Sequence, residues 1–139
     1  MSTYYYLQLK STRSGGIVNG YGDDADWAGW IPVRSAQFGP ATPVSVSSNS
    51  GVGRTEREFH EIQIVVNGDD LDVATLIRWA ADAEPCSAVL NQVPDAVGKN
   101  GVRWGMSDAL VINVQTSGML ISFTINFEKL DRRESLRFR

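Results

Sequence analysis

The stretch Met119-Leu120-Ile121-Ser122-Phe123-Thr124-Ile125-Asn126-Phe127-Glu128 decides the fold class of this 139-residue chain. Every second residue in it is apolar. Successive side chains of a β-strand point to opposite faces of a sheet, so this period of two predicts a strand with one face against a core. The predicted core face consists of Met119, Ile121, Phe123, Ile125 and Phe127.

The segment before this strand has the same period. Leu110, Ile112 and Val114 alternate with Val111, Asn113 and Gln115, and the connection Thr116-Ser117-Gly118 is short and rich in turn-forming residues. Two alternating segments joined by such a link predict an antiparallel hairpin.

Four further strands are predicted upstream, at residues 5–9, 31–35, 59–66 and 86–93. In the third of them His60, Ile62, Ile64 and Val66 share one face. Six short alternating strands favour a closed barrel or a sandwich, because an open antiparallel sheet leaves exposed edges. The predicted fold is therefore a compact, mainly β, antiparallel barrel or sandwich of six or more strands.

One segment has helical spacing instead. Over residues 72–81 the apolar side chains fall at i, i+3, i+4 and i+7, which predicts a single flanking α-helix. We expect Asp69 and Asp70 to cap its N-terminus, and Pro85 prevents its continuation. The predicted buried stripe consists of Val73, Leu76, Ile77 and Ala80.

Two stretches have no periodicity, residues 11–26 and residues 39–57, and both are predicted to be loops. The second is rich in Ser, Thr, Pro and Gly. Loops longer than about 15 residues are uncommon inside a compact domain and usually serve binding or assembly. Its segment Val44-Ser45-Val46 has the composition of an extended arm that reaches a neighbouring molecule.

Length and composition limit the class of protein. A mass of 15.3 kDa with 42% hydrophobic residues is typical of one domain, spanning residues 1–139. The net charge of -3 and the pI near 5.1 argue against a nucleic-acid partner. No window approaches the roughly 18 apolar residues of a membrane span, and no basic stretch leads into an apolar run at the start. We expect synthesis in the cytoplasm, with any export independent of a cleaved signal peptide.

Catalytic and metal-binding patterns are weak. Cys86 and His60 are the only residues of their types, which excludes an intrachain disulfide and a metal site of several His or Cys ligands. No G-x-S-x-G segment presents a serine to His60. The segment Gly51-Val52-Gly53-Arg54 lacks the third glycine of a dinucleotide fingerprint.

An acidic run remains as a candidate for chemistry. Asp23, Asp24 and Asp26 could bind a hard cation, but the spacing of a calcium loop with its distal glutamate is absent. We therefore expect no catalytic residue, no cofactor and no metal. An enzyme that uses His60 with these aspartates, and a monomeric barrel that holds a small ligand among the four tryptophans, remain as alternatives.

The order of these elements, together with two local patterns, resembles a known family. Ile31, Val33, Ser35, Phe38 and Gly39 are similar to a strand pattern I-x-V-x-S-x-x-aromatic-G, and the end from Phe123 to Leu130 resembles a last hairpin with the pattern v-x-L-x-F-x-K-aliphatic. Both patterns are those of the hemolysin-coregulated proteins, the inner-tube components of the bacterial type VI secretion system.

The resemblance implies a compact β-barrel with one helix, assembled into hexameric rings that stack into a tube. It implies contractile sheath and spike proteins as partners, small effector proteins as cargo in the lumen, export from the cell and no enzyme activity. It makes the long loop the candidate for ring stacking, with Pro43, Val44, Val46, Gly51, Gly53 and Arg54. A tube protein of phage-tail type is the nearest alternative.

Overall fold

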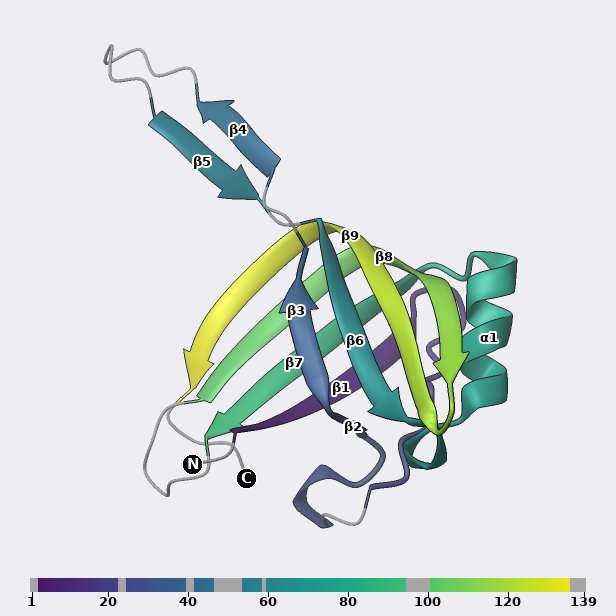
Figure 1. Ribbon diagram of the computed structural model, residues 1–139. Helices are drawn as coiled ribbons and strands as arrows, with labels where there is room; N and C mark the ends of the chain where they lie inside the picture. Colours follow the sequence, from purple (N-terminus) through teal and green to yellow (C-terminus); the bar gives the residue numbers. More distant parts are fainter. Residues whose placement is uncertain are drawn as a thin grey trace.

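The structure of the chain is a computed structural model that describes residues 3–22, 25–39, 42–46, 54–58, 60–94 and 101–135. Within these residues it contains nine strands, one α-helix and two 3-10 helices (Figure 1). In chain order they are β1 (Thr3–Ser11), η1 (Ala25–Trp27), β2 (Ile31–Val33), β3 (Ser35–Phe38), β4 (Thr42–Val46), β5 (Arg54–Glu58), β6 (Glu61–Asn67), η2 (Gly68–Asp70), α1 (Val73–Asp82), β7 (Cys86–Pro94), β8 (Gly101–Ser117) and β9 (Leu120–Ser135).

Seven strands form one antiparallel sheet in the order β2-β1-β7-β8-β9-β6-β3. Its two edge strands, β2 and β3, are consecutive in the chain and are separated only by Arg34. The chain therefore leaves β1 after Val33 and joins β6 at Ser35, which curls the sheet into a nearly closed barrel. The predicted antiparallel β-barrel with one helix is confirmed.

The last strand, β9, contributes a continuous row of side chains to the core of the barrel. Ile121, Phe123, Ile125 and Phe127 are all buried, as predicted. Met119 is not part of this face: it lies in the turn between β8 and β9 and is 71% exposed. Alternation cannot show where a strand ends and its turn begins, so the predicted strand began one residue early.

In β8 the predicted apolar face is wrong at its first position. Val111 is buried and Leu110 is 37% exposed, the reverse of the prediction. The segment has apolar residues on both faces of the strand, so its sequence does not show which face is buried. Asp108 (φ 51°) interrupts the alternation, and the buried residues are therefore Met106, Ala109 and Val111, with an interval of three and then of two. An irregular residue inside a strand exchanges its two faces. A second left-handed residue, Asn113 (φ 55°), follows, and after it Val114 packs partly buried against the core, as predicted.

The helix begins later than its first acidic residues suggest. Asp69 and Asp70 form η2, and the N-cap of α1 is Asp72, whose Oδ1 accepts a hydrogen bond from the Thr75 N–H at 3.2 Å. The Thr75 hydroxyl donates to the other carboxylate oxygen at 2.7 Å. These bonds lower the pKa of Asp72, the hydroxyl contact contributing most.

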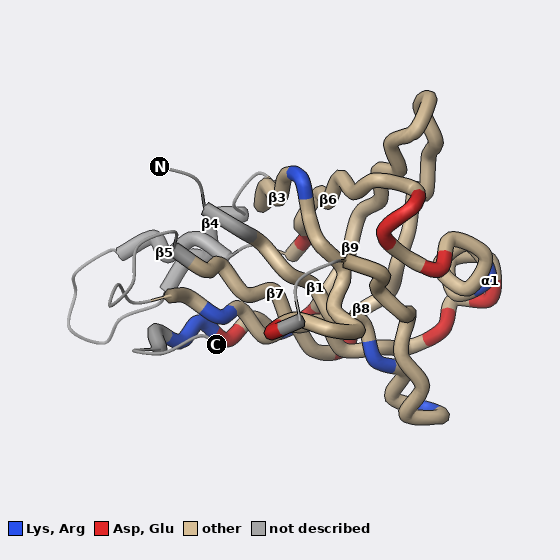
Figure 2. The backbone as a smooth tube through the Cα atoms, turned by 90° about the horizontal axis from the view of Figure 1, so that it is seen from below, with Lys and Arg blue, Asp and Glu red and all other residues tan. Residues whose placement is uncertain are grey.

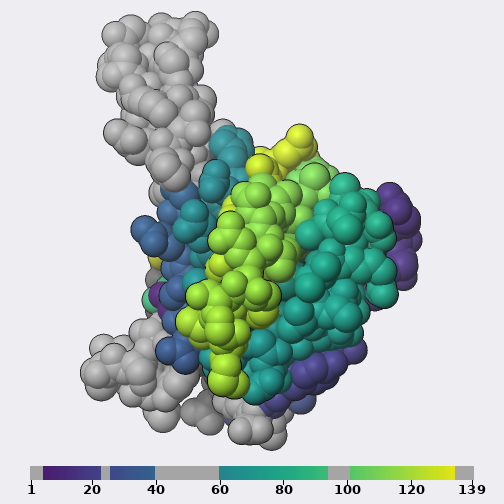
Figure 3. Space-filling model, turned by 45° about the vertical axis from the view of Figure 1, so that its right-hand side comes forward, coloured from purple at the N-terminus to yellow at the C-terminus, as the bar shows by residue number. Residues whose placement is uncertain are grey.

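The buried face of α1 also differs from the predicted stripe. Leu76 is buried and Val73 and Ala80 are partly buried, but Ile77 is 47% exposed and Trp79 takes its place against the core. An indole is larger than an isoleucine side chain, so turning it inward removes more apolar surface from water. The helix lies beside β8, and the two form adjoining parts of the surface in Figure 3.

The two stretches predicted as loops contain structure. In residues 11–26 the segment around Gly20 bridges to Gly29 on one side and to Leu71 on the other, and Val18 is fully buried. In residues 39–57, β4 and β5 pair as an antiparallel hairpin that projects beyond the end of the barrel (Figure 1). The extended arm is therefore a two-stranded element.

Candidate functional site

The residues of the 31–39 pattern hold the barrel together. Ile31 is buried, Val33 and Phe38 pack partly buried against the core, and Ser35 is exposed. Gly39 donates its N–H to the carbonyl oxygen of Glu61 at 2.9 Å, at the end of the β3–β6 ladder. The pattern therefore marks the segment in which the chain changes from one edge of the sheet to the other.

The switch between the two edges occurs at Arg34. Its N–H donates to the carbonyl oxygen of Val65 at 2.8 Å, and its Nη1 lies 3.4 Å from Oδ1 of Asn67. Both contacts bind the β2–β3 segment to β6. Nothing in the sequence distinguishes this arginine from an ordinary exposed residue of a strand.

The candidate stacking residues lie on the projecting hairpin as far as the structure describes them. Pro43, Val44 and Val46 belong to β4 and Arg54 begins β5. Gly51 and Gly53 lie outside the described residues. Among the described strands, β4 and β5 pair only with each other, so the outer side of each has main-chain groups with which no described strand pairs.

The residues considered for enzyme chemistry are not brought together. His60 lies before β6 rather than within it, Asp26 lies on η1, and both are exposed. The start of β6 and the segment with η1 lie at opposite ends of the barrel (Figure 1). Asp23 and Asp24 lie outside the described residues. In the part of the chain that the structure describes, no group of three or more His, Cys, Asp or Glu side chains is placed to hold a metal ion.

A serine and a carboxylate do meet, at the end of β1. The Ser11 hydroxyl donates to Oε2 of Glu84 at 2.6 Å and accepts the N–H groups of Arg13 and Ser14, each at 3.1 Å. Arg13 also lies 3.6 Å from Oε1 of Glu84. The hydroxyl thus donates one hydrogen bond and accepts two, and these bonds join β1 to the α1–β7 connection. This is a structural role.

Cys86 is buried where β7 begins. Its thiol lies 3.5 Å from the carbonyl oxygen of Ala109, and burial, followed by the charge of Glu84, raises its pKa to about 11. A thiolate is the reactive form of cysteine, so this position favours an inert side chain.

Charge is distributed unevenly over the described surface. Figure 2 shows acidic residues beside the start of α1, where Asp69, Asp70 and Asp72 follow one another closely, and basic residues near the end of β9. Arg133 contacts Asp131 at 2.9 Å, but both side chains are largely exposed, so the pair adds little stability. None of the described helices has the length and apolar character that crossing a membrane requires.

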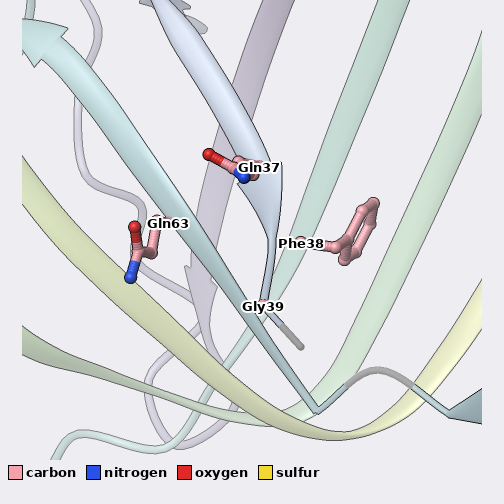
Figure 4. Close-up of a pocket in the computed structure, with 4 residues that line it drawn as sticks. All are labelled: Gln37, Phe38, Gly39 and Gln63. Carbon is pink, nitrogen blue, oxygen red and sulfur yellow. The ribbon is translucent and has the colours of Figure 1, made fainter. Parts of the chain in front are cut away.

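One hollow of about 300 Å³ lies on β3 and β6, lined by Gln37, Phe38, Gly39 and Gln63. Gln37 and Gln63 are directly opposite each other in the β3–β6 register. Figure 4 shows both amide side chains on one side of the strands and the Phe38 ring on the other. The sequence alone does not reveal this pair, because its only signal is that both glutamines lie on the polar side of a strand, and the pairing of the two strands has no local pattern.

Comparison with solved structures gives full-length matches. Hcp1 of the E. coli EAEC 042 pathovar superposes with a TM-score of 0.71 at 15% identity, over 97% of this chain and 99% of that one. The chain has the Hcp fold. Hcp1 of Salmonella typhimurium matches with a TM-score of 0.65 at 15% identity (93% of this chain, 85% of that one), and the secreted protein Hcp3 of Pseudomonas aeruginosa with 0.65 at 8% (94% and 97%).

The resemblance read from element order and local patterns is thereby confirmed for the fold, since the matches cover 97% and 99% of this chain. No protein-family model matches the sequence, and no curated protein matches it. The similarity to Hcp thus resides in the three-dimensional arrangement of the chain.

Proposed function

We infer that this Hcp-like chain is a non-catalytic tube subunit of a type VI secretion system, which forms hexameric rings that stack into a tube. The observation that carries this proposal is the length of the structural match: 97% of this chain and 99% of E. coli Hcp1 superpose. A match of this extent leaves little of either chain to form a separate catalytic or binding unit.

The projecting hairpin supports the stacking step. Rings and stacked rings require different patches on one subunit, because a contact that closes a ring cannot also extend it into a tube. A two-stranded element beyond the end of the barrel supplies a patch of its own, and it carries Pro43, Val44, Val46 and Arg54. We assign ring stacking to this hairpin and to the Gly51 and Gly53 positions between its strands.

The remaining roles follow from the same proposal. The tube would be surrounded by a contractile sheath, carry a spike protein at its end and hold small effector proteins in its lumen, with no nucleic-acid or membrane partner. The subunit would be made in the cytoplasm and leave the cell with the tube, without a cleaved signal peptide. It needs no cofactor.

The test is the native mass in solution by light scattering, with negative-stain imaging of the same fraction. Six copies of 15.3 kDa give about 92 kDa, and we expect annular particles of that mass. A monomer of about 15 kDa at high concentration would contradict the proposal and favour the alternative of a ligand-binding barrel. Rings that assemble only with phage components would favour the phage-tail alternative.

A further inference from the structure

We propose that Met119 is a site of reversible oxidation on the folded subunit, and that its sulfoxide prevents one ring from stacking on the next. The site lies at the end of the barrel opposite the β4–β5 hairpin. The oxidation itself is independent of the tube function, whereas its effect on stacking rests on that proposed function.

Met119 is the most exposed of the sulfur side chains that the structure describes. It is 71% exposed in the turn between β8 and β9, whereas Met106 is 1% exposed and Cys86 is fully buried. Burial also raises the pKa of the Cys86 thiol to about 11, so its reactive thiolate form is scarce at neutral pH. A peroxide in solution therefore meets one accessible sulfur atom among these three.

The main chain around Met119 is held in place, so the exposure of the side chain belongs to the folded state. The carbonyl oxygen of Met119 accepts the Gly68 N–H at 2.8 Å, and Leu120 pairs with Asn67 in the β6–β9 register. Gly118 (φ 61°) supplies the left-handed residue that the turn needs. The turn is thus fixed against η2, and no local opening is required before an oxidant reaches the sulfur.

Oxidation of Met119 changes the polarity of one side chain and leaves the fold intact. The thioether sulfur takes one oxygen atom from a hydroperoxide: an S–O bond forms, the O–O bond breaks, and the other oxygen takes up the proton and leaves as water or an alcohol. The sulfur loses two electrons and the peroxide gains two. Water solvates the new S–O dipole at this exposed position, whereas at Met106 the dipole would be buried in the core.

Met119 lies at the end of the barrel that receives the next ring. β6 runs from Glu61, at the base of the hairpin, to η2, whose first residue, Gly68, is bonded to Met119. The hairpin and the β8–β9 turn are accordingly at opposite ends of the barrel (Figure 1). A contact that repeats along a tube joins two different patches, so a ring that stacks through its hairpins receives those of its neighbour at the other end.

The receiving end has apolar side chains for such a contact. Tyr21 is 55% exposed on the other side of η2, where its N–H donates to the carbonyl oxygen of Asp70 at 2.8 Å. Two of the four large hydrophobic side chains that are exposed in the described part of the chain therefore flank this one short helix. A methionine fills irregular gaps in a contact, and a sulfoxide at the same place is polar and loses its water on burial.

The oxidation site is tested on the full chain with hydrogen peroxide and peptide mass spectrometry. Peroxide is applied to protein diluted below the concentration at which tubes form. We expect Met119 to gain one oxygen atom at least about tenfold faster than Met106, because only transiently opened molecules expose the core. Thermal unfolding of the oxidised chain should be unchanged. Methionine sulfoxide reductases A and B, one for each sulfoxide epimer, should together restore the original mass.

Light scattering and negative-stain images of the same samples measure the effect on stacking. Oxidised rings should form no tubes at a concentration at which untreated rings do, and enzymatic reduction should restore the tubes. Met119→Leu removes the sulfur at similar size, so this variant should form tubes after peroxide treatment. Met106→Leu is the matched control and should lose its tubes like the unchanged chain. Met119→Gln introduces an uncharged polar side chain of similar length and should form rings without tubes before any treatment.

Three results would overturn the inference: oxidation of Met106 as fast as that of Met119, tubes that form normally after complete oxidation of Met119, or peroxide sensitivity that persists in Met119→Leu. The tube proposal is tested separately by the untreated samples. A chain that is oxidised selectively at Met119 but stays monomeric contradicts the tube proposal, with its stacking contact, and supports the oxidation site. Untreated rings and tubes that do not respond to peroxide contradict only the present inference.

Discussion

The indole of Trp27 lies parallel to the ring of Tyr6, with the ring centroids 4.8 Å apart and 3° between their planes. Trp30 meets the same indole edge-on, at 5.3 Å and 88°. Tyr6 points to the opposite face of β1 from Leu7, so this cluster lies outside the main core and covers the outer face of the barrel. It fastens η1, in a stretch without periodicity, to the first strand.

Removal of this indole should destabilise the fold. We expect Trp27→Ala to lower the free energy of unfolding by about 3 kcal/mol, since it deletes a large buried side chain and its ring contacts. Urea denaturation measures the change. Tyr21→Ala is the control: Tyr21 is 55% exposed and its loss should cost no more than about 0.5 kcal/mol. Equal effects would mean that the stack contributes nothing.

Gly20 should tolerate no side chain. A Cβ at this position would lie 2.0 Å from the carbonyl oxygen of Trp30. This is a main-chain atom, and moving it away would disturb the bridge between Gly20 and Gly29. We expect Gly20→Ala to cost about 3 kcal/mol or to prevent folding. At Gly16 the nearest contact of a Cβ is 3.4 Å away, so Gly16→Ala should change stability by less than about 0.5 kcal/mol. Thermal unfolding of the two variants shows whether the close contact of Gly20 with Trp30 is the cause, or whether any alanine in this loop destabilises the fold.

The parts of the fold that followed from sequence are those in which one periodicity covers a whole element. Phe123, Ile125 and Phe127 satisfy the period of two over a strand that is buried on one face, and alternation was sufficient there. It failed at Leu110, because the left-handed residue Asp108 exchanges the inward and outward positions of the strand, and the hydropathy pattern does not show this. It failed at Ile77 because only tertiary packing decides between this isoleucine and the tryptophan two residues later.

The candidate site was less accessible to sequence reasoning. Gln37 and Gln63 are 26 positions apart, and only the register of β3 on β6 places them opposite each other. The hairpin of β4 and β5 was expected as an arm but not as paired strands, because its Ser, Thr, Pro and Gly content outweighed the short alternation at Val44 and Val46. Pairing between distant segments is a property of the three-dimensional fold and has no local signature.

The N-cap of α1 gives a pH dependence with a defined sign. The pKa of Asp72 is lowered from 3.8 by its bonds to Thr75, so the charged cap stabilises the folded state fully above pH 3.8 and this contribution disappears as the pH falls through the lower folded value. Asp72→Asn retains a capping side chain without the charge. We expect the stability difference between the two chains to be constant near pH 7 and to shrink below pH 3.8, as measured by urea denaturation at several pH values. A difference independent of pH down to pH 2 would contradict this role for the carboxylate.

Cys86 should report on opening of the barrel. Its raised pKa, about 11, and its burial keep the thiol protonated and out of reach at pH 8. A disulfide reagent should therefore label the native chain at least about a hundredfold more slowly than the urea-unfolded chain, because only transiently opened molecules react. Trp27→Ala should accelerate labelling in proportion to its loss of stability. Rapid labelling of the native chain would show that β7 is accessible where it begins.

The projecting hairpin can be removed at a defined point. Gly39 and Glu61 lie opposite each other as a hydrogen-bonded pair, so residues 40–60 can be replaced by a two-residue Asn-Gly turn that closes β3 onto β6. In the native chain the carbonyl oxygen of His60 accepts a hydrogen bond from the Phe127 N–H at 2.9 Å. The last residue of the new turn takes the position of His60 and supplies a main-chain carbonyl there. If stacking uses the hairpin, this variant should still form rings of six subunits in light scattering but no tubes in negative-stain images. A second variant replaces residues 42–58 by a Gly/Ser segment of the same length, which keeps the length of the connection but removes the paired strands. It should also fail to form tubes if the paired strands make the contact. Loss of the rings themselves would place the hairpin in the contacts around the ring, since the barrel that remains retains its core.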